Sequence, residues 1–227
     1  MIIDPYRWHT VRVTQIAHES TDAVSVQTER PAGYIFESGQ HAIVRITLPD
    51  GTQRLRQYSF AGSPAAKLIQ FVITRAPHGE VSSWFIDTSN TASLIEISQP
   101  FTGPLHLNID TYSHVGMIAG GSGIAPMLSY IHTLREHPDS PARTLLYTTR
   151  STSLCAANVL QETKGETILV RQTDVDGRLT HDEIIRALGG CDLILVCGSR
   201  QFVTELHALC TLRLPDVTVR AEAFSLN

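Results

Sequence analysis

Apolar and polar side chains alternate in short segments through the first hundred residues. Turn formers such as PDGT (49–52) separate six segments of this kind: HTVRVTQIA (9–17), AVSVQTE (23–29), HAIVRITL (41–48), LRQYSFA (55–61), LIQFVITR (68–75) and SLIEISQP (93–100). A period of two predicts β-strands with one buried face, and short strands at regular spacing are typical of a barrel. GEVSSWFIDT (79–88) predicts one interrupting helix, because Gly79 opens a turn and Trp84 and Phe85 supply apolar anchors.

Beyond about residue 110 the pattern changes to continuous apolar runs that alternate with segments of helical period. The runs are VGMIAGG (115–121), RTLLYTT (143–149), ETILVRQT (166–173) and DLILVCG (192–198). The helical segments are APMLSYIHTLREH (125–137), THDEIIRALG (180–189) and RQFVTELHALCTL (200–212). This alternation predicts a parallel sheet covered on both faces. We therefore expect two domains, an antiparallel six-stranded β-barrel at 1–110 and an α/β parallel sheet at 111–227, with any ligand site at their junction.

The composition narrows the functional classes. The chain has 227 residues, is 42% hydrophobic and 18% charged, and carries a formal net charge of -4. It lacks the surplus of basic charge that nucleic-acid binding requires. The first residues, MIIDPYRW (1–8), do not resemble a leader, and no apolar run approaches the roughly 20 residues that span a bilayer. We expect a cytoplasmic protein with no nucleic-acid partner and no membrane insertion.

Cysteine and histidine spacing argues against a metal site. The four cysteines are Cys155, Cys191, Cys197 and Cys210, and no two have the two-residue spacing of a zinc ribbon or a plant-type iron–sulfur run. His132 and His137 are too far apart for the i,i+4 face of a helical metal site. We expect neither a metal ligand nor an iron–sulfur cluster on this chain.

A glycine-rich turn links a predicted strand to a predicted helix in MIAGGSGIAPML (117–128). Gly120, Gly121 and Gly123 would let the backbone approach an anion, and the helix N-terminus offers free N–H groups. Pro126 suits the first helical turn, where no N–H partner is lost. Tight packing also demands glycine, so phosphate binding and packing both remain open. The loop matches neither the G-x-G-x-x-G fingerprint nor the Walker A motif.

Two strand ends carry further candidate chemistry. LILVCGS (193–199) places Cys197 where ligands bind in open α/β sheets, although a buried inert cysteine is the commoner case. LRQYSFAGSP (55–64) puts a cation, a flat ring and a hydroxyl within four residues. That segment fits either an ordinary barrel rim or a site for a flat phosphorylated ligand.

Five motifs in one order resemble the ferredoxin–NADP reductase superfamily. They are RQYS (56–59), GEVSSWF (79–85), GGSGIAP (120–126), VCGS (196–199) and EAF (222–224), and together they cover nearly the whole chain. The resemblance implies an NAD(P)H-dependent flavin oxidoreductase without an attached iron–sulfur domain. The barrel would bind the flavin and the α/β domain the nicotinamide nucleotide.

The resemblance also implies which residues hold the flavin. In the RQYS motif, which includes Gln57, Arg56 would pair with a flavin phosphate, a role that suits a guanidinium fork. Tyr58 would stack on the isoalloxazine ring, although it could equally be a half-buried barrel tyrosine. Ser59 would bond near N5 of the flavin. The pyrophosphate-binding turn would comprise Gly79, Val81 and Ser82, which favours FAD over FMN, whereas simple helix capping needs the same geometry.

The nicotinamide nucleotide would occupy the second domain. The resemblance assigns its pyrophosphate to Gly121, Ser122 and Gly123. Cys197, together with Gly198, would lie beside the nicotinamide. Glu222 fits the family's C-terminal carboxylate, or else an exposed carboxylate at a strand end. Phe224 fits the aromatic residue that covers the flavin, but Ser225, Leu226 and Asn227 follow it, so a gating role is not transferred.

Three choices remain open at the level of sequence. Thr149, Arg150, Ser151 and Arg171 could hold a 2′-phosphate, which favours NADPH over NADH. The electron acceptor would be a separate redox protein such as a ferredoxin or an oxygenase component. TDVDGRLT (173–180) resembles a loop of oxygenase reductases, in which Asp176 and Gly177 would form a turn and Thr180 would cap the following helix. A free-flavin or quinone reductase, or a noncatalytic flavin-binding subunit, are the alternatives. Thr102 stands where the family has a glycine after a phenylalanine, which makes the turn into the second domain atypical.

Overall fold

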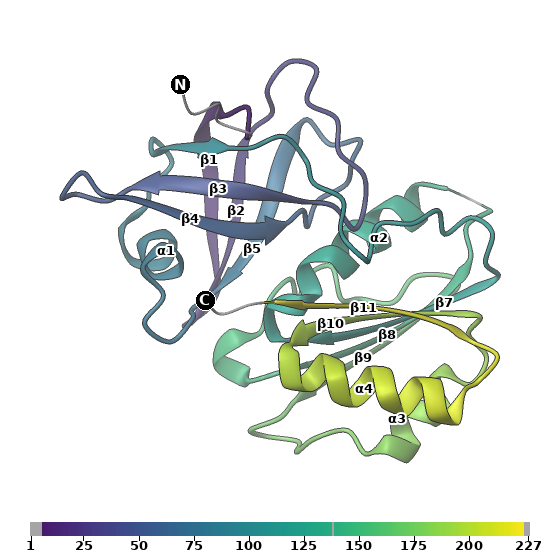
Figure 1. Ribbon diagram of the computed structural model, residues 1–227. Coiled ribbons are helices and arrows are strands. Elements are labelled where there is room, and N and C mark those ends of the chain that lie inside the picture. Colours follow the sequence, from purple (N-terminus) through teal and green to yellow (C-terminus); the bar gives the residue numbers. More distant parts are fainter. Residues whose placement is uncertain (1–5, 138, 225–227) are drawn as a thin grey trace.

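The computed structural model describes residues 6–137 and 139–224 and contains two sheets (Figure 1). The first is antiparallel, with strand order β4-β3-β6-β1-β2-β5. Its strands are β1 (His9–Ser20), β2 (Ala23–Glu29), β3 (His41–Thr47), β4 (Gln53–Ser59), β5 (Leu68–Thr74) and β6 (Leu94–Ile97). One buried cluster takes side chains from β1, β2, β3, β5 and β6, and Tyr58 of β4 packs against it. All six strands therefore surround one core, as in the predicted barrel.

The predicted helix between β5 and β6 has two parts. A short α1 (Glu80–Ser83) continues as a π-helical segment, Trp84–Thr88. Phe85 and Ile86 are buried in the barrel core, so the predicted apolar anchoring at Phe85 is confirmed.

The second sheet is parallel, with strand order β11-β10-β7-β8-β9. Its strands are β7 (His114–Gly120), β8 (Ala142–Thr149), β9 (Glu166–Gln172), β10 (Leu193–Ser199) and β11 (Thr218–Phe224). Helix α2 (Ile124–Glu136) packs on one face, and α3 (His181–Leu188) and α4 (Arg200–Arg213) pack on the other. Along β7, Met117 and Ala119 face α2 whereas Ile118 faces α3 and α4, which explains why the strand is apolar throughout. The predicted fold class is confirmed.

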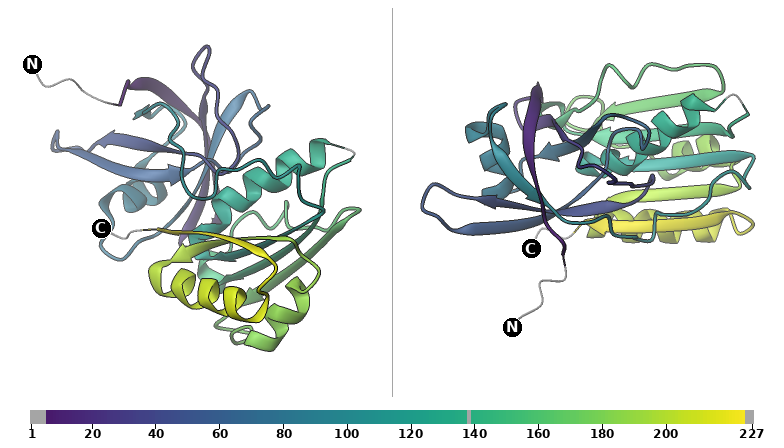
Figure 2. Two further views of the ribbon diagram at one scale, coloured as in Figure 1. Left: turned by 45° about the vertical axis from the view of Figure 1, so that its right-hand side comes forward. Right: turned by 90° about the horizontal axis from the view of Figure 1, so that it is seen from above.

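Helix α2 lies between the two sheets and joins the domains (Figure 2). The Ser129 hydroxyl donates to the carbonyl of Gly62 at 2.9 Å and lies 2.9 Å from the Ser38 hydroxyl, both on the barrel side. From the barrel hairpin, the Ser20 hydroxyl and the Asp22 N–H both donate at 2.8 Å to the carbonyl of Thr152. The chain passes from β6 to β7 through 98–113, and the boundary at residue 110 stays a prediction.

Candidate active site

A pocket of about 500 Å³ opens at the junction of the two domains. The barrel contributes Asp22, Thr74, Arg75 and Pro77 to its wall. Most of the remaining wall comes from the carboxyl ends of β7, β8 and β10 and from α3 and α4. Ligands of open α/β sheets bind at this edge of the sheet.

The glycine loop after β7 borders this pocket. Gly121 has φ +53°, a left-handed conformation that side chains rarely adopt, and the space beside it is open. At Gly123 a Cβ atom would overlap the carbonyl group of Cys197, so this glycine allows α2 to begin directly against β10. Gly123 thus serves packing, whereas the space beside Gly121 is open and phosphate binding stays a prediction. Gly121 and Ser122 line the pocket.

Helix α4 contributes a residue that the sequence analysis missed. The ring of Phe202 lies about 3.0 Å from the position of a Cβ on Gly120 and 2.7 Å from that of a Cβ on Gly198. The two glycines make room for this ring, which also lines the pocket. In the sequence, Phe202 lies three residues after the VCGS motif, in the first turn of α4. This closeness to a predicted site motif is the signal from which the residue could have been identified.

Strand β4 places Arg56 and Tyr58 on one face and Gln57 on the other, because side chains alternate along a strand. The Arg56 guanidinium donates to the carbonyl of Leu55 at 2.7 Å and makes no ion pair with any described residue. Tyr58 is half-buried beside Phe71 and Phe85, and burial raises its phenol pKa. The ordinary barrel contacts expected of this tyrosine are therefore present, and part of its ring is still exposed.

Ser59 ends β4 and is 3% exposed. Its Cα pairs with that of His41 at the start of β3. None of the residues 56–59 is among those that line the junction pocket.

The side chain of Ser82, in α1, bonds back to the turn that precedes the helix. The Ser82 hydroxyl donates to the carbonyl of Gly79 at 3.0 Å and accepts the N–H of Ala76 at 3.1 Å. Val81 is buried at 1% exposure. The Ser82 hydroxyl proton, expected to serve a pyrophosphate, is used inside the turn, and no side chain makes a capping hydrogen bond at the N-cap Gly79.

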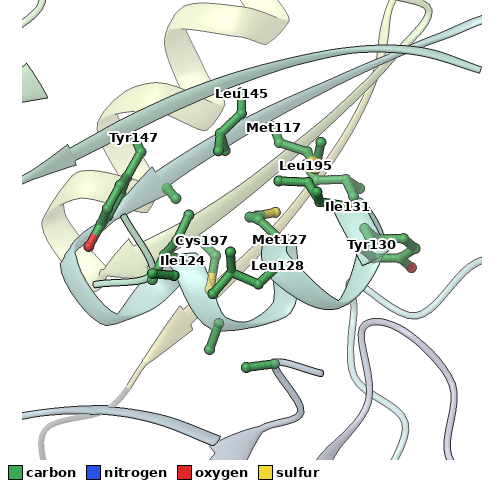
Figure 3. Packing of buried hydrophobic residues seen from close by; sticks show 14 of the residues in the cluster. Met117, Ile124, Met127, Leu128, Tyr130, Ile131, Leu145, Tyr147, Leu195 and Cys197 are labelled. Atoms are coloured by element: carbon green, nitrogen blue, oxygen red, sulfur yellow. The ribbon is translucent and has the colours of Figure 1, made fainter. Parts of the chain in front are cut away.

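Cys197 lies inside the packing of α2 against the sheet. Figure 3 shows its sulfur beside Ile124 and Leu128, and the residue is fully buried. Burial, and secondarily the charge of Glu222, raises the pKa of the thiol well above its ordinary value. The sulfur is an uncharged packing group in this arrangement, and its predicted place beside the nicotinamide is not tested.

Glu222 and Phe224 lie on β11, next to β10. Glu222 is not the exposed strand-end carboxylate that the sequence allowed, because burial raises its pKa and its buried Oε2 has no hydrogen-bond partner in the described chain. Phe224 ends the strand and lines the junction pocket. Ser225 to Asn227 lie outside the described residues.

The residues expected to hold a 2′-phosphate separate into two groups. Arg150 and Thr149 line the pocket, and Thr149 donates to the carbonyl of Ser153 at 3.2 Å. Arg171 does not line it, because its guanidinium pairs with Glu183 at 3.0 Å. Ser151 donates its N–H and its hydroxyl to the Asp174 carboxylate at 2.8 and 2.6 Å.

Arg178 lines the pocket, whereas Arg171 does not. The sequence analysis did not predict a binding role for Arg178. Neither Arg150 nor Arg178 forms an ion pair with a described residue. Two unpaired guanidinium groups in the lining of one pocket favour an anionic ligand there. The loop 173–180 was noted for its turn residues, and the arginine within it was overlooked.

Neither a metal-binding cluster nor a membrane-spanning helix is found among the described residues. Within 6–137 and 139–224, no three His, Cys, Asp or Glu side chains are grouped so that they could hold a metal ion. No described helix is both long enough and apolar enough to cross a bilayer.

Among curated proteins, the chain resembles a subunit of an epoxidase and an electron transfer component of a dioxygenase. It is 26% identical, over 96% of its length, to a subunit of the 1,2-phenylacetyl-CoA epoxidase of Escherichia coli K12, and the match covers 68% of that protein. It is also 26% identical, over 84% of its length, to the 2-halobenzoate 1,2-dioxygenase electron transfer component of Burkholderia cepacia, covering 59% of it. The chain thus spans about two thirds or less of these relatives. No family model matches it.

Solved structures share the fold over almost the whole chain. The full-length CYP116B46 of Tepidiphilus thermophilus superposes with a TM-score of 0.82 at 25% identity, covering 99% of this chain and 30% of that one. A ferredoxin NADP+ reductase of Neisseria gonorrhoeae with bound FAD and NADP superposes with a TM-score of 0.81 at 16% identity, covering 96% and 98%. For phthalate dioxygenase reductase the TM-score is 0.78 at 22% identity, covering 96% and 68%.

Proposed function

Since this chain has the two-domain fold of the ferredoxin–NADP reductase superfamily, we propose that it is an NAD(P)H-dependent flavin oxidoreductase whose electrons pass to a separate redox protein. The observation that carries the proposal is the junction pocket, which the glycine loop at the start of α2, two unpaired arginines and residues of the barrel all line. A nicotinamide dinucleotide has the matching parts, because its pyrophosphate suits a glycine loop at a helix N-terminus.

The barrel would hold FAD, with FMN the less favoured flavin. Three features of β4 fit this group: the unpaired Arg56 for a phosphate, the partly exposed ring of Tyr58 for stacking, and the Ser59 hydroxyl at the strand end. Bound FAD would supply the chemistry, because a flavin accepts a hydride from a reduced nicotinamide and releases electrons singly. Val81 would contribute its backbone N–H group, whereas the N–H of Gly79 already donates to the carbonyl of Ala76 at 2.9 Å.

The protein's part in the reaction is to place the two rings and keep water out. Phe202 and Phe224 are apolar walls of the pocket. Because burial raises its pKa, the Glu222 carboxyl keeps a proton to higher pH than an exposed glutamate does. Cys197 would contribute a neutral sulfur.

The pocket favours NADPH over NADH as the electron donor. Arg150 and Arg178, which line the pocket with the hydroxyl-bearing Thr149 and Thr173, offer cationic and polar partners for a 2′-phosphate. Arg171, paired with Glu183, would not take part.

The acceptor would be an oxygenase component or a ferredoxin. This assignment is supported by the relatives, whose names describe part of an epoxidase and a dioxygenase electron transfer component. In the described part of this chain no metal-binding cluster is present, so the one-electron carrier would reside on another protein or domain.

The test is the visible spectrum of the purified protein and its anaerobic titration with NADPH and, separately, with NADH. An oxidised-flavin spectrum that NADPH bleaches supports the proposal. Flavin that neither nucleotide reduces would make the chain a noncatalytic flavin-binding subunit, and failure to bind any flavin would refute the proposal. Rapid turnover with free flavin or quinone, but not with a redox protein, would favour the small-molecule reductase.

Arg56→Ala tests the placement of the flavin. We expect the variant to lose flavin on purification, because an unpaired phosphate forgoes a charge-assisted contact of about 1.5–3 kcal/mol. Arg213→Ala on the outer surface of α4 is the control and keeps its flavin. Equal flavin content in the two variants would remove Arg56 from the site.

A further inference from the structure

The Glu222 carboxylate lies against the backbone of Gly103, in the connection between the two sheets. A Cβ atom on Gly103 would lie 2.9 Å from Oε1 and 3.1 Å from Oε2 of Glu222. Carbon and oxygen atoms in ordinary contact are farther apart than this, so any side chain at 103 would displace the carboxylate. The φ angle of Gly103 is not in the left-handed region, so its backbone conformation does not require glycine.

Strand pairing determines the direction of the Glu222 side chain. The Cα of Glu222 pairs with that of Cys197 on the parallel strand β10, and paired positions of neighbouring strands point to the same face. Cys197 faces α2, as Figure 3 shows, so Glu222 faces the side of the sheet from which the connection 98–113 and the barrel approach.

The carboxylate has few electrostatic partners. No described cation forms an ion pair with it, including Arg220, which precedes it by two positions on β11 and is exposed. His106, on the connection, pairs with Glu37 instead. The Cys197 thiol, on β10, is the group whose pKa Glu222 affects. Oε2 is buried and lacks a hydrogen-bond partner, which is costly unless a ligand or water supplies one.

We propose that Gly103 is a positioning residue for Glu222. Because Gly103 has no side chain, the Glu222 carboxylate fits against its backbone. In this position Oε2 is held buried and unpaired at the domain junction, where it can accept a hydrogen bond from a ligand. The identity of that ligand, flavin or nicotinamide, rests on the proposed function. The atypical turn thereby has a role. Thr102 replaces the expected glycine, and the next residue, Gly103, makes the close approach to Glu222 instead.

The first test measures the carboxyl itself and needs no cofactor. The protein is labelled with ¹³C at glutamate side-chain carboxyls, and the signal absent from Glu222→Gln identifies the residue. In Gly103→Ala the methyl group pushes the carboxylate toward water, so we expect its pKa to fall by about one unit. Gly190→Ala is the control, because its Cβ would meet its nearest atom, Nδ1 of His114, at 3.7 Å. An unchanged Glu222 titration in Gly103→Ala would overturn the proposal.

The second test uses the flavin-loaded protein in stopped flow. Gly103→Ala should slow flavin reduction by NADPH on the order of tenfold, because a small displacement of a site group has a large effect on rate. In a Glu222→Asp background the shorter side chain leaves room for the methyl, so adding Gly103→Ala should change the rate less than about twofold. Equal rate losses in both backgrounds would show that Gly103 acts through folding alone. If the wild-type flavin is not reduced at all, the proposed function fails, while the carboxyl titration still decides the role of Gly103.

Discussion

Arg171, just before the loop 173–180, and Arg178, within it, show how neighbours decide the role of a charge. Arg171 donates to Glu183 at 3.0 Å and to the carbonyl of Asp176 at 3.3 Å, so it joins β9 to the start of α3. Arg178 is exposed, lines the junction pocket and has no ion-pair partner in the described chain. The sequence alone favoured Arg171 because it ends a strand, but strand position does not reveal that Glu183 already neutralises it.

Arg178→Ala is therefore expected to act on the coenzyme. On the proposed function Arg178 would face the 2′-phosphate, so its removal should raise the KM for NADPH about tenfold or more and leave the KM for NADH nearly unchanged. Steady-state kinetics with both nucleotides measure the effect. Arg171→Ala is the matched control, with reduced stability and unaltered coenzyme preference. A larger loss of NADPH affinity in Arg171→Ala than in Arg178→Ala would reverse the assignment.

Glu166 supplies a pH-dependent contribution to stability. Its side chain is 1% exposed and bonds to Arg135 and Arg143, each at 2.7 Å. Burial raises its pKa, but the bonds from these arginines and from Thr163 outweigh that effect and lower the pKa to about 2 from an ordinary value of 4.5. A depressed folded-state pKa stabilises the protein above pH 4.5, and this stabilisation is lost as the pH falls toward 2.

Glu166→Gln should lower the free energy of unfolding at pH 7 by about 3 kcal/mol, because it leaves two arginines without their anion. The difference from the wild type should shrink steadily when denaturant titrations are repeated from pH 5 to pH 3. Asp182→Asn is the control, because the Asp182 side chain is 77% exposed and its pair with Arg213 should contribute almost nothing. A difference that is independent of pH would contradict the role of the Glu166 charge.

At the scale of elements, features set by residues close in sequence could be predicted, whereas features set by distant contacts could not. Thr180 was predicted to cap α3, and it forms a reciprocal capping box with Glu183 that depends only on residues three apart. The π-helical segment Trp84–Thr88 has no comparable local signal. Strand β11 lies at the sheet edge and has no fully buried residue, so it lacks the continuous apolar run that identified its neighbours.

The α3 cap gives a prediction at this scale. The Thr180 hydroxyl accepts the N–H of Glu183 at 3.2 Å, and the Glu183 carboxylate accepts the N–H of Thr180 at 2.7 Å. Thr180→Ala should cost about 1 kcal/mol in chemical unfolding, whereas Thr180→Ser, which keeps the hydroxyl, should cost much less. Equal destabilisation by both substitutions would mean that the methyl group matters more than the cap.

For the whole molecule, the junction is the part that the sequence described least. Pattern and motif order predicted two sheets and the glycine loop, because each depends on a contiguous segment. Other features depend on residues that are distant in sequence. They are the contact of Glu222 with Gly103, the position of Phe202 and the hydrogen bonds of Ser129 to the barrel. No periodicity reports such contacts.

The hydroxyl contacts of α2 predict how the two domains unfold. Ser129 is fully buried and pairs with the carbonyl of Gly62, so Ser129→Val leaves that carbonyl unpaired and should cost about 1–3 kcal/mol. The chain has two tryptophans, Trp8 and Trp84, both on the barrel side, so fluorescence follows the barrel whereas far-UV circular dichroism follows both domains. We expect the two transitions to coincide in the wild type and to separate in Ser129→Val, because the domains then lose a shared contact. Thr204→Val, at an exposed position of α4, should leave them coincident. Transitions that coincide in Ser129→Val as well would mean that other junction contacts, such as those to the Thr152 carbonyl, are sufficient for cooperative unfolding.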